Sequence, residues 1–206
     1  MNDTLNVLIQ RLEASKDPIT AKAMSAYMRD QFPFLGIKTP LRSEIIKEFL
    51  ALHPPEREYQ YTALDILLKI RRKLEPQDLP LIEGFITSRS WWDTVDLLAS
   101  NAAGFLLHKF PQLQAEYGEK WLQSDNMWLN RTALLFQLHY KQDTNEALLY
   151  RYILTHAESP EFFIQKAIGW ALREYSKINP ASVKNFIEKE NLKPLSKREG
   201  LKWMNK

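Results

Sequence analysis

Two tryptophans and two carboxylates occur within six residues of this chain, and residues of these types at this spacing can bind or act on a charged ligand. Trp92 and Asp96 are four residues apart, so on a helix they share one face, with an aromatic surface beside an anion. Such a pair suits a cationic or electron-poor ligand. The structural alternative is that Trp91 and Trp92 anchor the core, while Asp93 or Asp96 serves the helix start, where the dipole favours a carboxylate. Both interpretations stay open on this stretch alone.

Other kinds of catalytic site find no support in the sequence. The chain has no cysteine, and its four histidines, at positions 53, 108, 139 and 156, stand at no spacing typical of metal ligands. Only six glycines are present, and neither a phosphate loop nor a dinucleotide fingerprint occurs. Motifs of serine nucleophiles are also missing. We therefore predict no metal and no cofactor.

The elements that must position the tryptophans and carboxylates are helices. Apolar residues recur at helical spacing almost throughout, and runs of alternating strand character are missing, so the sequence predicts an all-α fold. Prolines and Asp/Asn clusters divide it into candidate helices. These are residues 3–15, 18–32, 41–52, 56–74, 77–88, 91–109, 112–123, 127–141, 144–157, 161–177, 181–190 and 195–204.

Short connections force neighbouring helices to be antiparallel, and pairs that repeat about every 40 residues are typical of HEAT or armadillo arrays. Trp92 and Trp128 are 36 residues apart, and Trp128 and Trp170 are 42 apart, each in the first helix of a pair. We predict a curved HEAT-like solenoid with a concave face, forming a single domain over residues 1–206. Equivalent helices then form one wall, which would bring Arg131 and Trp170 to Trp92 and Asp96. Alternatively, Trp128 and Trp170 fill gaps between repeats.

Composition limits the setting in which the protein works. The N-terminus lacks a basic start followed by an apolar run, and no apolar stretch approaches the roughly 20 residues that span a bilayer. We therefore expect a cytoplasmic protein with no membrane partner. The formal net charge of +3 permits binding to nucleic acid without requiring it.

Seven short motifs occur in an order that supports a recognition. They are Tyr27-Met28 with Phe34-Leu35-Gly36-Ile37 and Thr39-Pro40, Ala63-Leu64-Asp65, Ser90 to Asp96, Asp125-Asn126 with Trp128-Leu129 and Arg131, Phe162 to Trp170, Leu172-Arg173-Glu174, and Pro194 to Glu199. With these residues the chain resembles the bacterial AlkD-type DNA alkylation repair proteins over nearly its whole length. Members of that family are HEAT-like-repeat glycosylases that remove cationic alkylated purines from duplex DNA.

The resemblance implies a role for each matching residue. Asp96 is expected to be the catalytic carboxylate, with Trp92 and Trp170 as aromatic walls and Arg131 as a cation that contacts the DNA backbone. The other expected DNA contacts come from one aromatic and four basic residues, namely Tyr27, Lys166, Arg173, Lys197 and Arg198. Arg71, Arg72 and Lys73 are further basic candidates, although cations are also common in a solvated last helical turn.

The chemistry that the resemblance implies is coherent. The leaving base of an N3- or N7-alkylated purine is already cationic, so no general acid has to protonate it. Positive charge develops on the deoxyribose instead, and a fixed carboxylate can stabilise it. The tryptophan faces add cation–π attraction. The family acts without drawing the base into a deep pocket, unlike enzymes that flip the base.

One departure from the family leaves the function open. The predicted helix 41–52 is followed by His53-Pro54-Pro55 and then directly by another helix, so a partner helix of some four turns is missing. We therefore carry three alternatives: an active alkylpurine glycosylase, a DNA-binding paralog without excision, and a HEAT scaffold for a protein partner. The helical array itself predicts a monomer.

Overall fold

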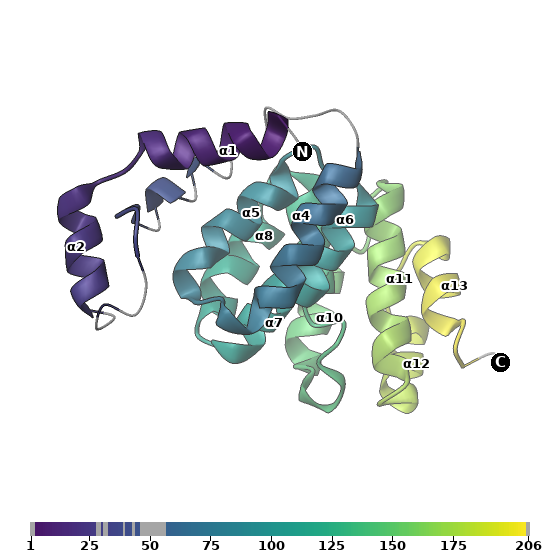
Figure 1. The fold of residues 1–206 in the computed structure, drawn as a ribbon. Helices are drawn as coiled ribbons and strands as arrows, with labels where there is room; N and C mark the ends of the chain where they lie inside the picture. The colour runs from purple at the N-terminus through teal and green to yellow at the C-terminus, as the bar shows by residue number, and fades with distance from the viewer. Residues whose placement is uncertain are drawn as a thin grey trace. The chain divides into compact units, whose positions relative to one another are not determined.

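The computed structural model describes residues 3–27, 30, 33–38, 40–42, 44–45 and 57–204 (Figure 1). These residues form helices joined by turns, and no strand occurs among them. The predicted all-α class is therefore confirmed. None of the helices in these ranges combines the length and the apolar character needed to cross a bilayer.

The chain divides into two compact units, Met1–Gln60 and Tyr61–Lys206. The single domain over residues 1–206 and the concave HEAT-like array stay predictions. In the first unit, α1 spans Asp3–Ala14 and α2 spans Pro18–Tyr27, and residues 40–42 and 44–45 are helical. Most of the predicted helix 41–52 and the His53-Pro54-Pro55 junction lie outside the described residues. The missing partner helix therefore stays a hypothesis.

In the first unit, the motif around Gly36 closes on the start of α2. The Asp17 carboxylate accepts hydrogen bonds from the Ile19 and Thr20 amides, at 3.0 and 3.3 Å, which caps the helix. The Asp17 amide in turn donates to the Leu35 carbonyl at 2.9 Å. Gly36 has a φ of +81°, and a Cβ there would lie 2.1 Å from the Asp17 carbonyl oxygen, so only glycine fits. This motif therefore has a structural role within its own unit.

The second unit is a succession of helices. The first of them, α4, begins in the last residues of the first unit. They are α4 (Arg57–Ile70), α5 (Leu79–Thr87), α6 (Trp92–Leu97), α7 (Gly104–Lys109), α8 (Glu119–Leu122), α9 (Met127–Leu135), α10 (Glu146–Thr155), α11 (Phe162–Ser176), α12 (Pro180–Lys189) and α13 (Pro194–Leu201). Short 3₁₀ segments cover Arg71–Lys73, Pro76–Asp78 and Lys141–Asp143. A π-helical segment, Leu98–Ala103, joins α6 to α7, and another, Gln114–Gly118, precedes α8.

The structure reproduces most of the predicted helices but shortens two of them, and the helix predicted over 18–32 ends at Tyr27. The single helix predicted over 91–109 is the continuous run of α6, the π-helical segment and α7. The helix predicted over 127–141 instead ends at Leu135. After it, the Gln137 side chain accepts a hydrogen bond from the Asn145 amide at 2.8 Å, and Lys141 takes a left-handed φ of 54°. These local contacts favour a turn where the apolar periodicity predicted a further helical turn.

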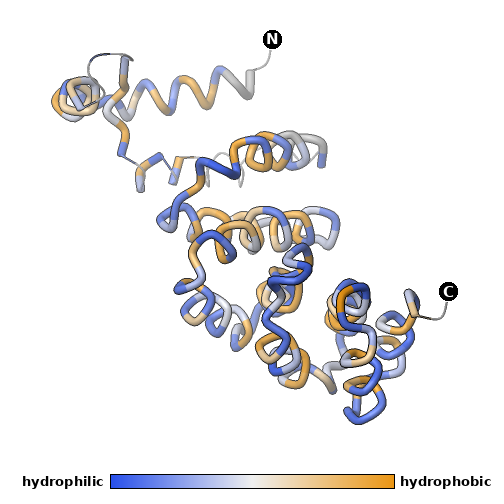
Figure 2. The backbone as a smooth tube through the Cα atoms, turned by 90° about the horizontal axis from the view of Figure 1, so that it is seen from below, coloured by the Kyte–Doolittle hydropathy of each residue, from blue (hydrophilic) through white to orange (hydrophobic). Residues whose placement is uncertain are grey.

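The core of the second unit is formed by the apolar faces of its helices. Figure 2 shows hydrophobic and hydrophilic residues alternating along the helices, as amphipathic helices require. The largest fully buried side chains include Trp121, Tyr152, Phe136, Leu79, Ile82, Ile86, Leu106 and Leu107. The buried indole N–H of Trp121 donates a hydrogen bond to the Glu83 carboxylate at 2.8 Å.

Helix α13 packs against α11 through Gly169. A Cβ on Gly169 would lie 2.3 Å from the Glu199 Cβ and 3.1 Å from the Ser196 carbonyl oxygen. Beside this contact, the Ser196 hydroxyl donates to the Gln165 carbonyl at 3.0 Å. Helix α13 can therefore lie this close to α11 only because residue 169 is a glycine, which has no side chain.

We predict that Gly169→Ala destabilises the protein, because the added methyl group must push α13 away from α11. Overpacking of this kind costs about 1–3 kcal/mol. Chemical denaturation would measure the loss of unfolding free energy. A matched control is Lys184→Ala on the exposed face of α12, where we expect a change within about 0.5 kcal/mol. Equal effects of the two substitutions would contradict the close contact.

Candidate functional site

The site is built on a buried ion pair between Asp96 of α6 and Arg131 of α9. Arg131 Nε donates to Asp96 Oδ1 at 2.7 Å, and Nη2 donates to Oδ2 at 2.8 Å. This is the two-pronged geometry in which a guanidinium binds a carboxylate most strongly. Both residues are buried, and the Arg131 side chain is 3% exposed against 12% for that of Asp96. The carboxylate is therefore the more accessible member of the pair.

Arg131 also connects this pair to α11. Its Nη1 donates to the backbone carbonyl of Phe163, and its guanidinium carbon lies 5.9 Å from the ring centroids of both Phe163 and Trp170. One side chain thus links α6, α9 and α11. The resemblance implies that Arg131 contacts the DNA backbone, and this contact stays a prediction. In the structure, the Arg131 guanidinium binds and orients the Asp96 carboxylate.

The two adjacent tryptophans have different surroundings. Trp91, the residue before α6, packs its ring 5.1 Å from Phe163 and 5.8 Å from Trp128, and Phe163 and Trp128 are also 5.1 Å apart. These three rings form an aromatic cluster where α6, α9 and α11 begin. Trp92 is the first residue of α6 and remains 46% exposed, one turn before Asp96. Trp91 is 50% exposed as well, so both tryptophans keep aromatic surface available to a ligand.

Trp170 lies between two guanidinium groups. Its ring centroid is 5.9 Å from the guanidinium carbon of Arg131 and 5.7 Å from that of Arg173. The side chain is half-buried on α11, the same helix that supplies the Phe163 carbonyl. The structure therefore brings Asp96, Arg131 and Trp170 into one connected group, as the spacing of the helix pairs predicted, while Trp92 shares a helix with Asp96.

Asp93 is held by contacts that differ from those of Asp96. Its carboxylate accepts a hydrogen bond from the Tyr61 hydroxyl at 2.6 Å and from the Thr94 amide at 2.9 Å. Asp93 thus ties the start of α6 to α4. These contacts are typical of a structural carboxylate, whereas Asp96 is the one paired with Arg131.

Two of the predicted DNA-binding cations meet at a buried carboxylate, Glu199. Lys166 lies 3.0 Å and Arg173 lies 3.7 Å from its oxygens, and Lys202 lies 2.7 Å away. Burial works to raise the pKa of Glu199, but hydrogen bonds from Lys202 and Lys166 hold that pKa below its ordinary value of 4.5. Lys166 and Arg173 therefore already have a structural partner in Glu199. DNA phosphates would have to share the two cations with this carboxylate.

The remaining predicted contacts are distributed over both units. Lys197 is half-buried and Arg198 is exposed on α13. Tyr27, at the end of α2 in the first unit, is 87% exposed. Each of these three side chains is accessible to solvent, and their contacts with DNA stay predictions. Among the described residues no group of three or more His, Asp or Glu side chains converges as metal ligands would.

The sequence analysis missed the supporting role of the aromatic cluster. Residue type and spacing indicate Trp91 and Trp128 as fillers of the core or of gaps between repeats, and Phe163 as part of a motif, but not that the three rings meet. A backbone carbonyl, such as that of Phe163, carries no signal in the residue type. The run Phe162-Phe163, so near Trp170, was the one available hint.

Comparison with known proteins decides the family. The family model described as DNA alkylation repair enzyme matches residues 8–204, nearly the whole chain. The chain belongs to the DNA alkylation repair enzyme family. A solved structure of a "predicted DNA alkylation repair enzyme" from Enterococcus faecalis is similar to this chain, with 35% sequence identity and a TM-score of 0.69. The similarity covers 93% of this chain and 98% of the other. A search of curated proteins found no match.

For this member of the DNA alkylation repair enzyme family, we predict a strong energetic coupling between Asp96 and Arg131. Removing one partner leaves an uncompensated buried charge, which costs about 3–5 kcal/mol. We therefore expect Asp96→Ala and Arg131→Ala each to lower the unfolding free energy by that amount. The double variant should lose much less than the sum of the two. A double-mutant cycle in denaturant measures this coupling, and additive losses would contradict it.

We also predict that the stabilisation from Glu199 depends on pH. Its pKa in the folded protein lies below the unfolded value of 4.5, so its contribution is complete above that value and is lost as the pH falls through the lower, folded pKa. The difference in unfolding free energy between wild type and Glu199→Gln should therefore be largest near neutral pH and shrink below about pH 4. Urea titrations across this range would show it. A difference in unfolding free energy that does not vary with pH would show that the ionised Glu199 carboxylate is not the source of the stabilisation.

Proposed function

We propose that the protein is a DNA glycosylase that excises cationic N3- and N7-alkylated purines from duplex DNA. The observation that carries this proposal is the Asp96 carboxylate, which Arg131 fixes with two hydrogen bonds of 2.7 and 2.8 Å and which remains the more accessible member of the pair. A rigid, largely buried anion one helical turn from the exposed Trp92 suits a transition state that develops positive charge.

The reaction needs little from the protein beyond this anion. As the bond between C1′ and the purine nitrogen breaks, the base leaves with the bonding electrons and becomes neutral. Water adds to C1′ and gives up a proton, leaving an abasic site. Between these events the deoxyribose carries oxocarbenium character, which the Asp96 carboxylate would stabilise electrostatically while it orients the water. No general acid is required, because the base is cationic before it leaves.

Arg131 would act through Asp96 in this mechanism. Its two hydrogen bonds prevent the carboxylate from rotating, and preorganisation of this kind avoids a reorganisation cost during the reaction. The Phe163 carbonyl and the rings of Phe163 and Trp170 fix the guanidinium in turn. Trp92 and Trp170 would supply the aromatic surfaces beside the cationic nucleotide.

Contacts with the DNA backbone would come from the predicted basic residues. Lys197 and Arg198 lie on α13, which packs against α11, the helix that carries Lys166 and Arg173. Phosphate contacts of this kind make affinity fall steeply with salt. We further propose that the protein acts as a monomer in the cytoplasm, without a cofactor.

The decisive experiment is release of 7-methylguanine from a defined duplex. We expect wild type to release the base and Asp96→Asn to be slower by about 100- to 1,000-fold, the usual effect of removing a transition-state stabiliser. Asp143→Asn, in the exposed 3₁₀ turn, is a matched control that should keep the wild-type rate. Circular dichroism would check that each variant is folded.

The same assay separates the alternatives. Binding of the duplex with a steep salt dependence but without release, in wild type, would indicate a DNA-binding paralog without excision. Neither binding nor release would favour a scaffold for a protein partner. Release that is equal in wild type and Asp96→Asn would support glycosylase activity but would show that Asp96 is not the catalytic carboxylate.

A further inference from the structure

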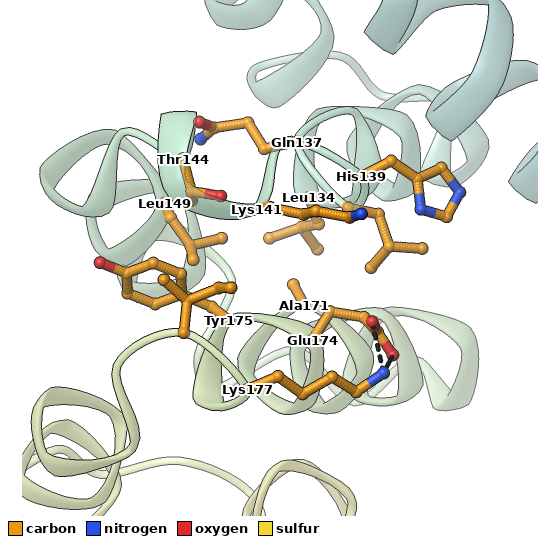
Figure 3. A pocket seen from close by; sticks show the side chains of 12 residues that line it. Leu134, Gln137, His139, Lys141, Thr144, Leu149, Ala171, Glu174, Tyr175 and Lys177 are labelled. Atoms are coloured by element: carbon orange, nitrogen blue, oxygen red, sulfur yellow. Dashed lines mark hydrogen bonds and ion pairs between the residues drawn. The ribbon is translucent and has the colours of Figure 1, made fainter.

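A pocket of about 280 Å³ lies apart from the Asp96 site, between the segment that follows α9 and the second half of α11. Figure 3 shows Leu134 and Lys141 on one side of it and Ala171, Glu174 and Lys177 on the other. Neither Asp96, Trp92, Arg131 nor Trp170 lines it. The pocket is therefore a separate feature that the proposed function does not use.

The inner surface of the pocket is apolar. Leu134, Leu149 and Ala171 contribute to it and are each at most 5% exposed. Leu138 and Ile178 extend this surface. Ligand sites are usually concave and mostly apolar, from about 300 Å³ upward, with a few polar groups that fix orientation. The volume here is close to the lower end of that range, so it suits a molecule of about two fused rings.

The charges around the pocket leave one cation available. Lys177 and Glu174 are paired with each other at 2.6 Å and neutralise one another. Lys141 forms no ion pair with any of the described residues, and Figure 3 shows its side chain extending along the pocket. Lys141, Lys177 and Glu174 together give the lining an excess of one positive charge, and this charge lies beside an apolar surface.

The backbone at Lys141 is strained, which is a second and independent observation. Its φ of 54° lies in the left-handed region, which costs a residue other than glycine roughly 1 kcal/mol or more. The surrounding turn enforces this conformation. The Tyr140 hydroxyl donates to the Gly104 carbonyl at 2.7 Å, and Gln137 holds the Asn145 amide at 2.8 Å. Glycine would adopt the same turn without strain, so the stability of the turn does not explain the presence of a lysine here.

We propose that this pocket binds a small amphipathic anion, a molecule with a rigid apolar body and one carboxylate or sulfonate group. The apolar body would lie on Leu134, Leu149 and Ala171, and the anionic group would bind the Lys141 ammonium. The inference goes beyond the proposed glycosylase activity and does not depend on it, since the two sites share no lining residue.

The test uses three probes of one shape and different charge, titrated calorimetrically into the full-length protein. They are 2-naphthoate, 2-naphthylmethanol and 2-naphthylmethylamine. We expect 2-naphthoate to bind most tightly and the cationic amine most weakly, with at least tenfold between them, because only the anion pairs with Lys141. Ala171→Phe, which fills the pocket, should abolish binding of all three.

A second variant separates ligand binding from folding. Lys141→Gly removes both the ammonium and the backbone strain, so it should raise the melting temperature while weakening 2-naphthoate binding at least tenfold. Lys184→Gln, on the exposed face of α12, is the matched control and should leave both quantities unchanged. Absence of 2-naphthoate binding, equal binding of the three probes, or unchanged binding in Lys141→Gly would each overturn the proposal.

Discussion

The burial of the Arg131 guanidinium is the constraint on which the rest of the candidate site depends. A guanidinium carries five N–H donors and a charge, so it can be buried only where acceptors and an anion surround it. Asp96 supplies the anion, and the Phe163 carbonyl supplies a further acceptor. Because these partners come from α6 and α11, the position of Arg131 on α9 fixes the mutual arrangement of all three helices.

Packing around α11 extends this constraint to the C-terminal end of the chain. Helix α11 carries both Phe163 and Trp170, and α13 holds it through the close contact at Gly169 and the charges gathered at Glu199. Lys166 and Arg173, expected from the resemblance to contact DNA, also take part in this packing. A cation that is paired in the free protein can still meet a phosphate, but it must then divide its interaction between two anions. If the proposed DNA contacts of Lys166 and Arg173 form, binding of DNA and stability of α13 would be coupled through Glu199.

The structure also separates two uses of positive charge. Arg131 is buried with its anion and contributes order, whereas Lys141 is exposed on a strained turn beside an apolar pocket. The first arrangement suits a site where a charge must not move. The second is typical of a residue retained for what it binds, since a glycine at the same position would cost less.

The sequence by itself determined the helices and the family. Helical periodicity and the spacing of prolines predicted nearly every described helix, because amphipathic patterns report directly on one buried face. The motifs predicted membership of the DNA alkylation repair family, and residue spacing placed Trp92 and Asp96 on one helix. The end of α9 at Leu135 escaped prediction, because hydrogen bonds between the Gln137 side chain and the Asn145 backbone outweigh periodicity there.

Only the tertiary structure decided what Arg131, Trp91 and Lys166 do. Their partners are Asp96, Phe163 and Glu199, each more than 30 residues away in the chain. Charge and hydropathy along a sequence show that a cation or a ring is present, but not whether it faces solvent or a buried carboxylate. That choice depends on the packing of helices from distant segments, and a backbone carbonyl such as that of Phe163 leaves no trace in the residue type.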